Sequence, residues 1–600
     1  MKMYIVFLAP IGRLSMLKTQ NCGELRLTDV GRTVVLAGWL HRSRDHGGLI
    51  FLDLRDRSGL VQVTADPTVG EAFEIAGKAR SEYVLRVEGT VRERPEDTVN
   101  PDLATGEVEV LARAIEILNS AKTPPIPLDD DGYKTDEITR LKYRYLDLRR
   151  ERLQRNIILR HKTIKFMRDY LDAQGFLEIE TPVLIKSTPE GARDYVVPSR
   201  VHPGKFFALP QSPQQLKQLL MVAGFEKYFQ IARCMRDEDL RGDRQPEFTQ
   251  LDLEMSFVKR DDVLAVVEGL ISGLVPAVTP HKRFISPFPK MSHADAMDRY
   301  GSDKPDIRFG MEIMDVTEPL RNSELRFISE AVAAGAVVKC LIATGCAEYS
   351  RREQDDLAAF IKAAGAKDLA TIAWTSEGIK GNIGKKFAAC EIEAIARITE
   401  AKEGDLACIV VDRAATACKA LGALRLNFRD RLNLAATDLL AFAWVVDFPM
   451  FEWDEGEKKW NFMHHPFTSP RPEHMGMLES NPGKVMSDAY DLVCNGYELS
   501  SGSIRIHDRD LQSRIFLALG YEEDEIRRKF GHMLDAFEYG APPHGGMAPG
   551  VDRLIMLLAD EPNIREVIAF PKTASAADVM FDAPSELSPK HMRELRIKTI

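Results

Sequence analysis

The sequence is poor in residues that form covalent or metal cross-links. Its 8 cysteines are spread along 600 residues, no two have CxxC spacing, and none lies in a cysteine–histidine cluster with zinc-finger spacing. These absences argue against a structural zinc site. Scattered thiols in a chain of this length are typical of the reducing cytoplasm, so we expect a cytoplasmic protein.

Long hydrophobic runs are also missing. The opening segment, MKMYIVFLAPIGRLS, has an apolar run after Lys2, but this run is short for a signal segment and lacks a convincing cleavage site. We interpret residues 1–15 as a disordered extension or the product of an upstream start codon. Beyond them, no uninterrupted apolar stretch is long enough to cross a bilayer, so we expect no membrane partner.

There is no general excess of positive charge. The chain has 80 Lys and Arg against 90 Asp and Glu, which gives a net charge of −10. This balance argues against indiscriminate binding of polyanions but is compatible with nucleic-acid binding through a local basic patch. The hydrophobic content of 44% is ordinary for a globular protein, and the length predicts about three or four domains.

Residues 16–122 contain short segments rich in β-branched and apolar residues, separated by turn residues. Together with a single helix near 69–79, they predict a small Greek-key barrel such as an OB-fold. The predicted strands are 34–40, 49–54, 60–64, 83–89 and 108–111.

A turn in this region combines Arg42, Arg44 and His46 with the nearby Phe51. Cations beside an aromatic ring are what a site for stacking single-stranded bases requires. The alternative is a solvated hairpin with Phe51 in the core, and these residues taken alone favour that alternative.

The following segments change character several times. Residues 123–150 are rich in proline and acidic residues and are interpreted as a linker or hinge. An amphipathic helix is predicted over 149–173, with Leu153, Met167 and Leu171 on its apolar face, followed by a strand over 176–180. We interpret 295–430 as an inserted α+β domain that interrupts a larger domain formed by 151–294 and 431–572. Residues 573–600 form a polar C-terminal extension.

Two distant segments each place an arginine among carboxylates, glutamines or glycines. They are ARCMRDEDLRGDRQPEFTQLDLE at 232–254 and GGMAPGVDRLIMLL at 545–558. Two such arginines can bind a triphosphate at both ends, provided that the fold brings them into one pocket. Taken singly, an Arg/Asp/Glu run is more often a solvated helix face.

These segments occur together with QSPQQLKQ, HHPF and GYELSSGSIRIH, in an order that resembles bacterial aspartyl-tRNA synthetases. The resemblance covers nearly the whole chain beyond residue 16. It implies an α+β multidomain protein with an OB-fold anticodon-binding domain and a class II catalytic domain built on an antiparallel sheet. The lysyl and asparaginyl relatives share the class motifs but characteristically lack the large insertion at 295–430.

The resemblance implies an enzyme that attaches L-aspartate to tRNA(Asp) through an aspartyl-adenylate, with ATP as substrate. It also implies a homodimer, with the helix 149–173 and the strand ending at Pro182 at the interface. The alternatives are a related synthetase for another amino acid and an inactive tRNA-binding paralogue. Loss of Arg236, Arg553 or Glu498 would favour the paralogue, and all are present.

By resemblance, the catalytic residues are Arg236, which bridges the α-phosphate and the amino-acid carboxylate, Arg553 at the γ-phosphate, and Glu498. Adenine stacks on Phe248. Asp491 and Glu498 hold Mg²⁺ against the phosphates, as few protein carboxylates plus phosphate oxygens commonly do. The further ATP-binding residues implied are Asp237, Glu238, Gln245, Gly550, Val551 and Asp552.

Aspartate recognition requires cations for its side-chain carboxylate and acceptors for its ammonium group. By resemblance, Lys217 and Arg505 are the cations. The residues implied on the ammonium side and at the closing loop are Glu190, Gln214 and Asp252, with Arg236 at the α-carboxylate and His464 as a substrate-sensing histidine.

The choice of tRNA depends on the first domain. In this family a histidine followed by glycines, here His46, resembles the relaxed form that charges both tRNA(Asp) and tRNA(Asn). A small residue after the fourth strand marks relaxed enzymes and a lysine strict ones, whereas Asp97 matches neither. We therefore expect charging of both tRNAs, with a strictly tRNA(Asp)-specific enzyme as the alternative. The anticodon-binding residues implied are Arg44, His46, Phe51, Gln62 and Asp97.

Overall fold

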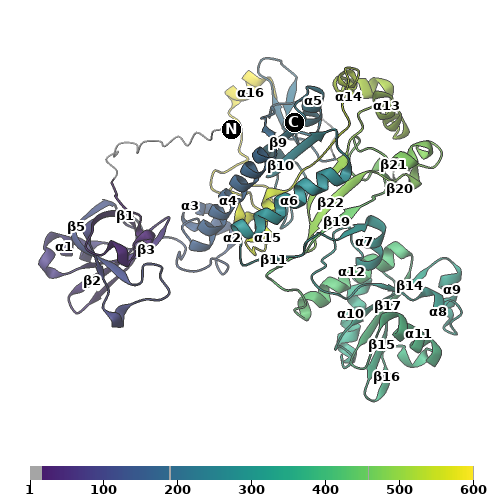
Figure 1. Ribbon diagram of the computed structural model, residues 1–600, viewed down its shortest axis with the longest axis horizontal. Coiled ribbons are helices and arrows are strands. Elements are labelled where there is room, and N and C mark those ends of the chain that lie inside the picture. Colours follow the sequence, from purple (N-terminus) through teal and green to yellow (C-terminus); the bar gives the residue numbers. More distant parts are fainter. Residues whose placement is uncertain (1–16, 188–190, 457, 599–600) are drawn as a thin grey trace, which may run out of the picture. The chain divides into compact units, whose positions relative to one another are not determined.

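The computed structural model describes residues 17–187, 191–456 and 458–598 (Figure 1). The chain divides into two compact units, one ending at Gln154 and the other beginning at Arg155. Among the described residues, no helix combines the length and the apolar character needed to span a membrane. Residues 1–15, which we interpreted as an extension, lie outside the described part of the chain.

The first unit contains a closed five-stranded barrel with the strand order β1-β2-β3-β5-β4. The predicted OB-like barrel is therefore confirmed. Alternate residues of β4 are buried, as expected when every second side chain points inward. The elements are β1 (Thr33–His46), β2 (Leu49–Asp56), β3 (Gly59–Ala65), α1 (Glu71–Lys78), β4 (Val84–Glu93) and β5 (Val108–Asn119).

Strands β1 and β2 form a hairpin whose last pair is His46 and Leu49. The two residues between them, Gly47 and Gly48, have φ of 61° and 86°. A tight turn of this kind needs a positive φ at both positions, which glycine adopts without steric cost. Phe51, on β2, is only partly buried and does not belong to the barrel core, whereas its neighbours Ile50 and Leu52 do. The interpretation that places Phe51 in the core is therefore wrong.

The predicted linker, 123–150, contains two short helices, α2 (Glu137–Lys142) and α3 (Arg144–Asp147). They surround a fully buried carboxylate, Asp147. Its oxygens accept hydrogen bonds from Arg140 Nε at 3.1 Å, Arg144 Nη1 at 2.8 Å and Arg150 Nε at 2.7 Å. A buried anion with this many donors organises the segment locally. The role of these residues as a hinge stays a prediction.

The second unit is built on an eight-stranded sheet with the order β12-β19-β22-β23-β24-β10-β9-β6. Its six central strands pair antiparallel, as expected for a class II catalytic domain, and β12 and β6 add parallel edges. The strands are β6 (Leu177–Glu178), β9 (Lys227–Met235), β10 (Glu247–Ser256), β12 (Lys290–Ser292), β19 (Phe442–Val446), β22 (Ala489–Cys494), β23 (Tyr497–Ile504) and β24 (His544–Met547).

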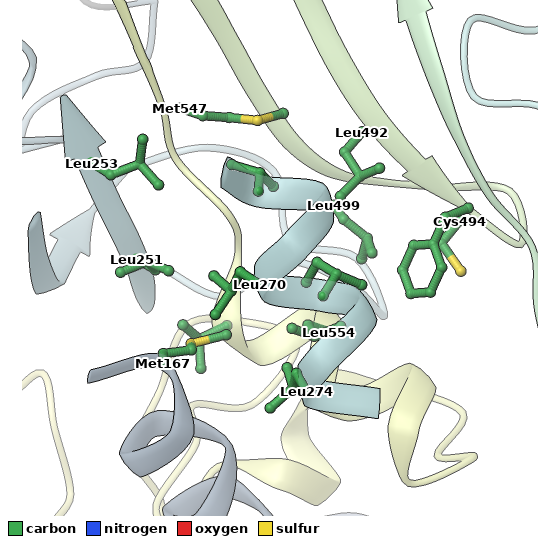
Figure 2. Close-up of a cluster of buried hydrophobic side chains, with 14 of the residues drawn as sticks. Met167, Leu251, Leu253, Leu270, Leu274, Leu492, Cys494, Leu499, Met547 and Leu554 are labelled. Atoms are coloured by element: carbon green, nitrogen blue, oxygen red, sulfur yellow. The ribbon is translucent and has the colours of Figure 1, made fainter. Parts of the chain in front are cut away.

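One face of this sheet packs on helices. Leu251, Leu492 and Met547 from the strands meet Leu270 of α6 (Arg260–Val278) and Leu554 of α15 (Val551–Leu558) in one apolar cluster (Figure 2). Helix α4 (Glu151–Ala173) adds Met167 and Leu171 to the same cluster. The apolar face predicted for this helix is therefore committed to the core of its own chain. The homodimer with this helix at its interface stays a prediction.

Smaller elements complete the second unit. They are β7 (Val196–Pro198), β8 (Phe206–Ala208), α5 (Gln214–Val222), β11 (Arg283–Phe284), α7 (His293–Tyr300), β18 (Leu439–Leu440), β20 (Phe451–Asp454), β21 (Lys459–Phe462), α13 (Arg509–Ala518), α14 (Glu523–Phe537) and α16 (Pro589–Leu595). The predicted strand 176–180 is reduced to the two residues of β6.

The segment predicted as an insertion has its own five-stranded sheet, ordered β13-β14-β17-β15-β16. Along β17, Leu406, Cys408 and Val410 belong to one apolar cluster, and Ala407 and Ile409 belong to another. Both sheet faces are thus covered by helices, because successive side chains point to opposite faces. The elements are β13 (Met314–Asp315), α8 (Thr317–Leu320), α9 (Arg326–Ala333), β14 (Val337–Ala343), α10 (Arg351–Ala363), β15 (Ala370–Thr375), β16 (Gly378–Lys380), α11 (Ala389–Thr399), β17 (Leu406–Asp412) and α12 (Ala414–Arg431). The domain boundaries themselves stay predictions.

The arginines around Asp147 generate a test of the first unit. Asp147→Asn removes the negative charge but keeps the shape, so Arg140, Arg144 and Arg150 each lose their ion pair with Asp147. We expect residues 123–154 to lose about 3–5 kcal/mol of opening free energy, measured by hydrogen–deuterium exchange. Asp129→Asn is the control: its 2.9 Å ion pair with Arg42 is exposed and should contribute less than about 1 kcal/mol. Equal effects of both variants would contradict this structural role of Asp147.

Candidate active site

A cavity of about 300 Å³ opens on the sheet where β10, β23 and the start of α15 meet. The two arginine segments, so distant in sequence, both contribute to its wall. The predicted site residues that line it are Gln214, Lys217, Arg236, Glu238, Gln245, Phe248, Asp252, His464, Glu498, Arg505, Gly550, Asp552 and Arg553.

Strand β10 forms one wall of the cavity. Phe248, Gln250 and Asp252 all line it, because residues two apart on a strand share a face. Glu254 continues this row, is fully buried, and lies between two cations. The strand therefore presents an aromatic ring at one end of the row and carboxylates at the other.

The carboxylates of β10 fix the two cations predicted to recognise aspartate. Lys217 Nζ is 3.1 Å from Asp252 Oδ1 and 3.5 Å from Glu254 Oε2. Arg505 donates from Nε to Glu254 Oε1 at 2.9 Å and from Nη2 to Glu254 Oε2 at 3.2 Å, a bidentate arrangement. Both cations are almost completely buried. Glu254 thus holds Lys217 and Arg505 side by side.

Glu254 was missed by the sequence reasoning, although a signal was available. It follows Asp252 by two positions in a segment expected to contribute to the site, so a strand would place both on one face. Burial acts to raise the pKa of Glu254, but the charges of Arg505 and Lys217 outweigh it and lower the pKa. Glu254 is therefore held as an anion.

Asp252 differs from Glu254 in one important respect. Its Oδ1 accepts from Lys217, but its buried Oδ2 has no hydrogen-bond partner among the described residues. Burial, opposed by Lys217, raises the pKa of this carboxyl. A buried acceptor without a donor is costly unless a bound molecule supplies one. The Asp252 Oδ2 atom is thus a candidate acceptor for a cationic ligand group.

The histidine pair divides into two roles. His465 Nε2 lies 2.8 Å from Arg505 Nη1, whereas His464 Nε2 lies 3.5 Å from Asp491 Oδ1. Burial and the charge of Arg505 lower the pKa of His465 well below its ordinary value. Burial acts to lower the pKa of His464 too, but Asp491 outweighs it and raises the pKa. His465, which the sequence reasoning did not select, is the histidine that contacts the aspartate-side cation.

The predicted phosphate-binding arginines lie in contrasting surroundings. Arg236 lies 5.2 Å from the Phe248 ring centroid, and its buried Nε has no hydrogen-bond partner among the described residues. Arg553 is engaged, donating from Nη1 to the Glu498 carbonyl at 2.7 Å and pairing with Asp243 Oδ2 at 3.1 Å. Arg236 therefore offers free donors to an anion, and Arg553 is already oriented.

A glycine allows β24 to approach β10 closely at this site. A Cβ on Gly546 would lie 2.1 Å from Glu254 Oε2 and 2.2 Å from the Leu253 carbonyl oxygen. Neither distance is possible for a real side chain, so only glycine permits the close pairing of β24 with β10. Gly546 therefore protects the position of Glu254.

Some predicted ATP-binding side chains have structural partners instead. The Asp552 carboxylate accepts from the Thr249 backbone N at 2.7 Å and pairs with Arg160. The Gln245 amide donates to the Lys572 carbonyl at 3.1 Å and accepts from the Lys572 N at 2.8 Å. Both side chains join separate parts of the chain, so their contribution to ATP binding stays a prediction.

The cavity does not collect every predicted residue. The Val551 side chain belongs to the apolar core, and Asp237 is paired with Arg193 at 3.5 Å, so neither lines the cavity. Asp491 is not in the lining either, although it lies beside His464 and Glu498. Glu190 lies outside the described residues.

Asp491 and Glu498 form a pair of carboxylates that is a candidate metal site. Burial and the neighbouring Asp491 raise the pKa of Glu498, which shows that the two carboxylates oppose each other. The buried Asp491 Oδ1 accepts no hydrogen bond among the described residues. Two such carboxylates fit a Mg²⁺ ion that takes its other ligands from phosphate and water. Within the described part of the chain, no cluster of three or more His, Cys, Asp or Glu forms a self-sufficient metal site.

The predicted anticodon residues belong to the first unit. Arg44 and Phe51 are directly paired across β1 and β2, and Arg44 Nη2 lies 3.3 Å from Gln62 Oε1. His46 is exposed at the end of the hairpin. Asp97 is exposed in a short turn, Glu96–Thr98, after β4. Arg44, Phe51 and Gln62 therefore share one barrel surface.

The barrel, the antiparallel sheet and the two-arginine cavity together are the features of a class II tRNA synthetase. The family model described as "tRNA synthetases class II (D, K and N)" matches residues 136–574, and the model of an OB-fold nucleic acid binding domain matches 34–118. The chain belongs to the class II tRNA synthetases of this D, K and N family.

Similar proteins narrow the comparison. An "Aspartate--tRNA(Asp/Asn) ligase" of Heliobacterium modesticaldum is 55% identical over 97% of this chain and 96% of its own. An "Aspartate--tRNA ligase" of Geobacillus kaustophilus is 53% identical over 97% of this chain and 99% of its own. The structure of asparaginyl-tRNA synthetase from Pyrococcus horikoshii with asparaginyl-adenylate is 21% identical, covers 96% of this chain and 100% of its own, and has a TM-score of 0.59, which shows the shared fold.

The opposite pKa shifts of the adjacent His464 and His465 can be measured. Because the pKa of His464 is raised and that of His465 is lowered, His464 should be protonated and His465 neutral at pH near the ordinary value of about 6.5. NMR of the ¹⁵N-labelled imidazoles, assigned with His464→Gln and His465→Gln, measures both. Titration of the two rings with a common midpoint would show that they do not occupy these different environments.

Proposed function

We propose that this chain activates L-aspartate with ATP and transfers the aspartyl group to tRNA(Asp) and tRNA(Asn). The observation that carries the proposal is the division of charge in the cavity. One end presents Lys217 and Arg505 as a matched pair of buried cations, and the other presents the free donors of Arg236 above the Phe248 ring. The first suits a side-chain carboxylate and the second an α-phosphate.

Aspartate is bound in an orientation determined by these charges. Its side-chain carboxylate is bound by Lys217 and Arg505, and its ammonium group donates to Asp252 Oδ2, which lacks another donor. Its α-carboxylate is left to face Arg236. Lys217 with Arg505, Asp252 and Arg236 thus give each charged group of the amino acid a partner of opposite sign.

Activation is a displacement at the α-phosphorus. An oxygen of the aspartate α-carboxylate forms a bond to phosphorus, the bond to the bridging oxygen breaks, and pyrophosphate leaves. Arg236 neutralises charge on the reacting phosphate, and Arg553 holds the far end of the triphosphate. In the second step, the 3′-hydroxyl of the terminal adenosine of the tRNA attacks the carbonyl carbon, and AMP leaves. No protein base is required for the first step, because the nucleophile is already an anion.

Asp491 and Glu498 are the residues that would hold Mg²⁺ on the phosphate side. When bound, the ion supplies charge neutralisation for the triphosphate. His464 lies against Asp491 and restricts the orientation of that carboxylate. Glu498 also lies in the cavity wall, so it couples the metal position to the site of Arg553.

A homodimer is part of the proposal, on a different surface from the apolar face of α4. Leu177, Val183 and Leu184 remain 50%, 51% and 50% exposed at the edge of the sheet near β6. Exposed apolar side chains in sequence proximity are typical of an interface, and a two-fold dimer is the commonest closed assembly. The partner is therefore a second copy that covers this edge.

Aspartate-dependent exchange of pyrophosphate into ATP tests the proposed chemistry. Lys217→Met should raise the KM for aspartate far more than that for ATP, because a buried substrate carboxylate loses its cation. Arg553→Ala should instead impair the ATP reaction by about 3–5 kcal/mol of transition-state stabilisation. If Lys217→Met unfolds at too low a temperature to be assayed, Arg505→Lys is the second variant. It keeps the positive charge but loses the bidentate guanidinium geometry, so it should also raise the KM for aspartate.

Two results would refute these assignments. Wild-type protein without aspartate-dependent exchange would exclude the activity. Equal increases in the KM for aspartate and the KM for ATP in Lys217→Met would mean that Lys217 does not recognise the amino acid.

The tRNA choice is tested with the two purified transcripts. The exposed His46, followed by Gly47 and Gly48, and the absence of a lysine at Asp97 favour charging of both. We expect the preference for tRNA(Asp) to remain below about a hundredfold, or about 2.7 kcal/mol. Asp97→Lys adds a cation at this loop and should increase the preference for tRNA(Asp). A larger preference in the wild type would instead favour a strictly tRNA(Asp)-specific enzyme.

A further inference from the structure

A loop at the start of the inserted segment contacts Glu498, a residue of the cavity wall. This root loop, residues 301–313, connects α7 to β13. It begins at Gly301, whose φ is 66° and whose Cβ, if present, would lie 2.0 Å from the Cys418 carbonyl oxygen of α12. The chain therefore turns here in a conformation that favours glycine while packed on a helix.

A single buried arginine on α12 organises the root loop. Arg425 donates hydrogen bonds to the carbonyl oxygens of Asp306, Phe309, Gly310 and Met311, at distances from 2.8 to 3.0 Å. Its guanidinium also lies 3.9 Å from the Phe309 ring centroid. A planar group with five donors suits a set of convergent carbonyls. The path of the loop is thus fixed from the helix at the far end of the inserted segment.

Further contacts fix the loop to the catalytic sheet. The Asp306 side chain is fully buried and pairs with Arg308 at 2.7 Å and Arg429 at 3.1 Å. Ile307 packs against a cluster that includes Val445 of β19 and Val493 of β22. The loop is therefore anchored both to α12 and to the strands that carry Asp491 and precede Glu498.

This anchoring presents Lys304 to Glu498. The Lys304 Nζ lies 3.9 Å from Glu498 Oε2 and 3.3 Å from Asp303 Oδ1, and its side chain is 43% exposed. Glu498 also accepts from Arg553 through its backbone carbonyl. Two cations thus converge on the residue that joins the cavity to the candidate metal position. Lys304 and Arg553 both oppose the burial that raises the pKa of Glu498.

The contact with Glu498 does not use the donor capacity of Lys304. An ammonium group has three donors, and a distance of 3.9 Å is an ion pair without a hydrogen bond. Its other acidic neighbour is Asp303, adjacent in the sequence. With the charges of Glu498 and Asp491 balanced by a bound cation, Lys304 would no longer be needed as their counter-charge, and phosphate oxygens bound there would be the anions available to it.

We propose that Lys304 binds the terminal phosphates of ATP and the departing pyrophosphate, so that the root of the inserted segment supplies a cation to the active site. This proposal rests on the proposed function, because it assigns a further residue to the same reaction. It gives the inserted segment a direct part in the chemistry, because the hydrogen bonds of Arg425 fix the loop that carries Lys304.

Kinetics of pyrophosphate exchange test this role. Lys304→Met should raise the KM for ATP and the inhibition constant of pyrophosphate about ten- to hundredfold, the range of a hydrogen bond to a charged group. The KM for aspartate should stay within about threefold. Lys304→Arg should recover most of the ATP affinity. Lys367→Met, an exposed lysine on the same inserted segment, is the matched control and should behave like the wild type.

Chemical labelling of the wild-type protein provides a second measurement that does not depend on a variant. ATP with Mg²⁺ should protect Lys304 from acetylation by acetic anhydride, read by mass spectrometry, whereas aspartate alone should not. Lys367 should be labelled equally in all conditions.

Several outcomes would overturn the inference. One is an unchanged KM for ATP in Lys304→Met, including the case in which only the Mg²⁺ requirement changes, since Lys304 would then merely balance the two carboxylates. Another is labelling of Lys304 that ATP does not reduce. Failure of the proposed function is distinguishable, because the wild type would then lack aspartate-dependent exchange altogether.

Discussion

The buried carboxylate of Glu254 is the constraint on which the active site depends. It accepts two hydrogen bonds from Arg505 and lies 3.5 Å from Lys217, so it holds two like charges close together where water cannot screen them. Without this anion the two cations would repel each other. The close pairing of β24 on β10, which only Gly546 permits, keeps that carboxylate in place. The position of the two cations proposed to bind aspartate thus depends on the geometry of the sheet.

The cavity combines satisfied and unsatisfied charges in an orderly way. Lys217, Arg505 and Arg553 are already oriented by protein partners, which lowers the entropic cost of binding a ligand. In contrast, Arg236 Nε, Asp252 Oδ2 and Asp491 Oδ1 are buried without hydrogen-bond partners among the described residues. These three atoms lie on the sides proposed for the α-phosphate, the ammonium group and the metal ion. A folded chain tolerates such atoms when a ligand completes them.

The inserted segment is attached to the catalytic sheet by polar as well as apolar contacts. Arg425 donates hydrogen bonds to backbone carbonyls of the root loop, and Ile307 packs beside the central strands. The position of Lys304 therefore depends on α12, more than a hundred residues later in the sequence. This dependence gives the insertion a physical connection to Glu498 in the cavity wall.

The sequence by itself determined the local structure and the class of chemistry. Alternating apolar residues predicted the barrel strands, and the order of the motifs indicated the family, because both depend on short-range spacing. Only the tertiary structure decided which partners the charged side chains have. It placed His465 at Arg505 and His464 at Asp491, gave Asp552 and Gln245 structural bonds, and revealed Glu254 as the central anion. It also placed Phe51 outside the barrel core and the apolar face of α4 inside its own domain. The reason is physical: periodicity records which face of an element is apolar, whereas the salt bridge between Glu254 and Arg505 depends on how distant segments align.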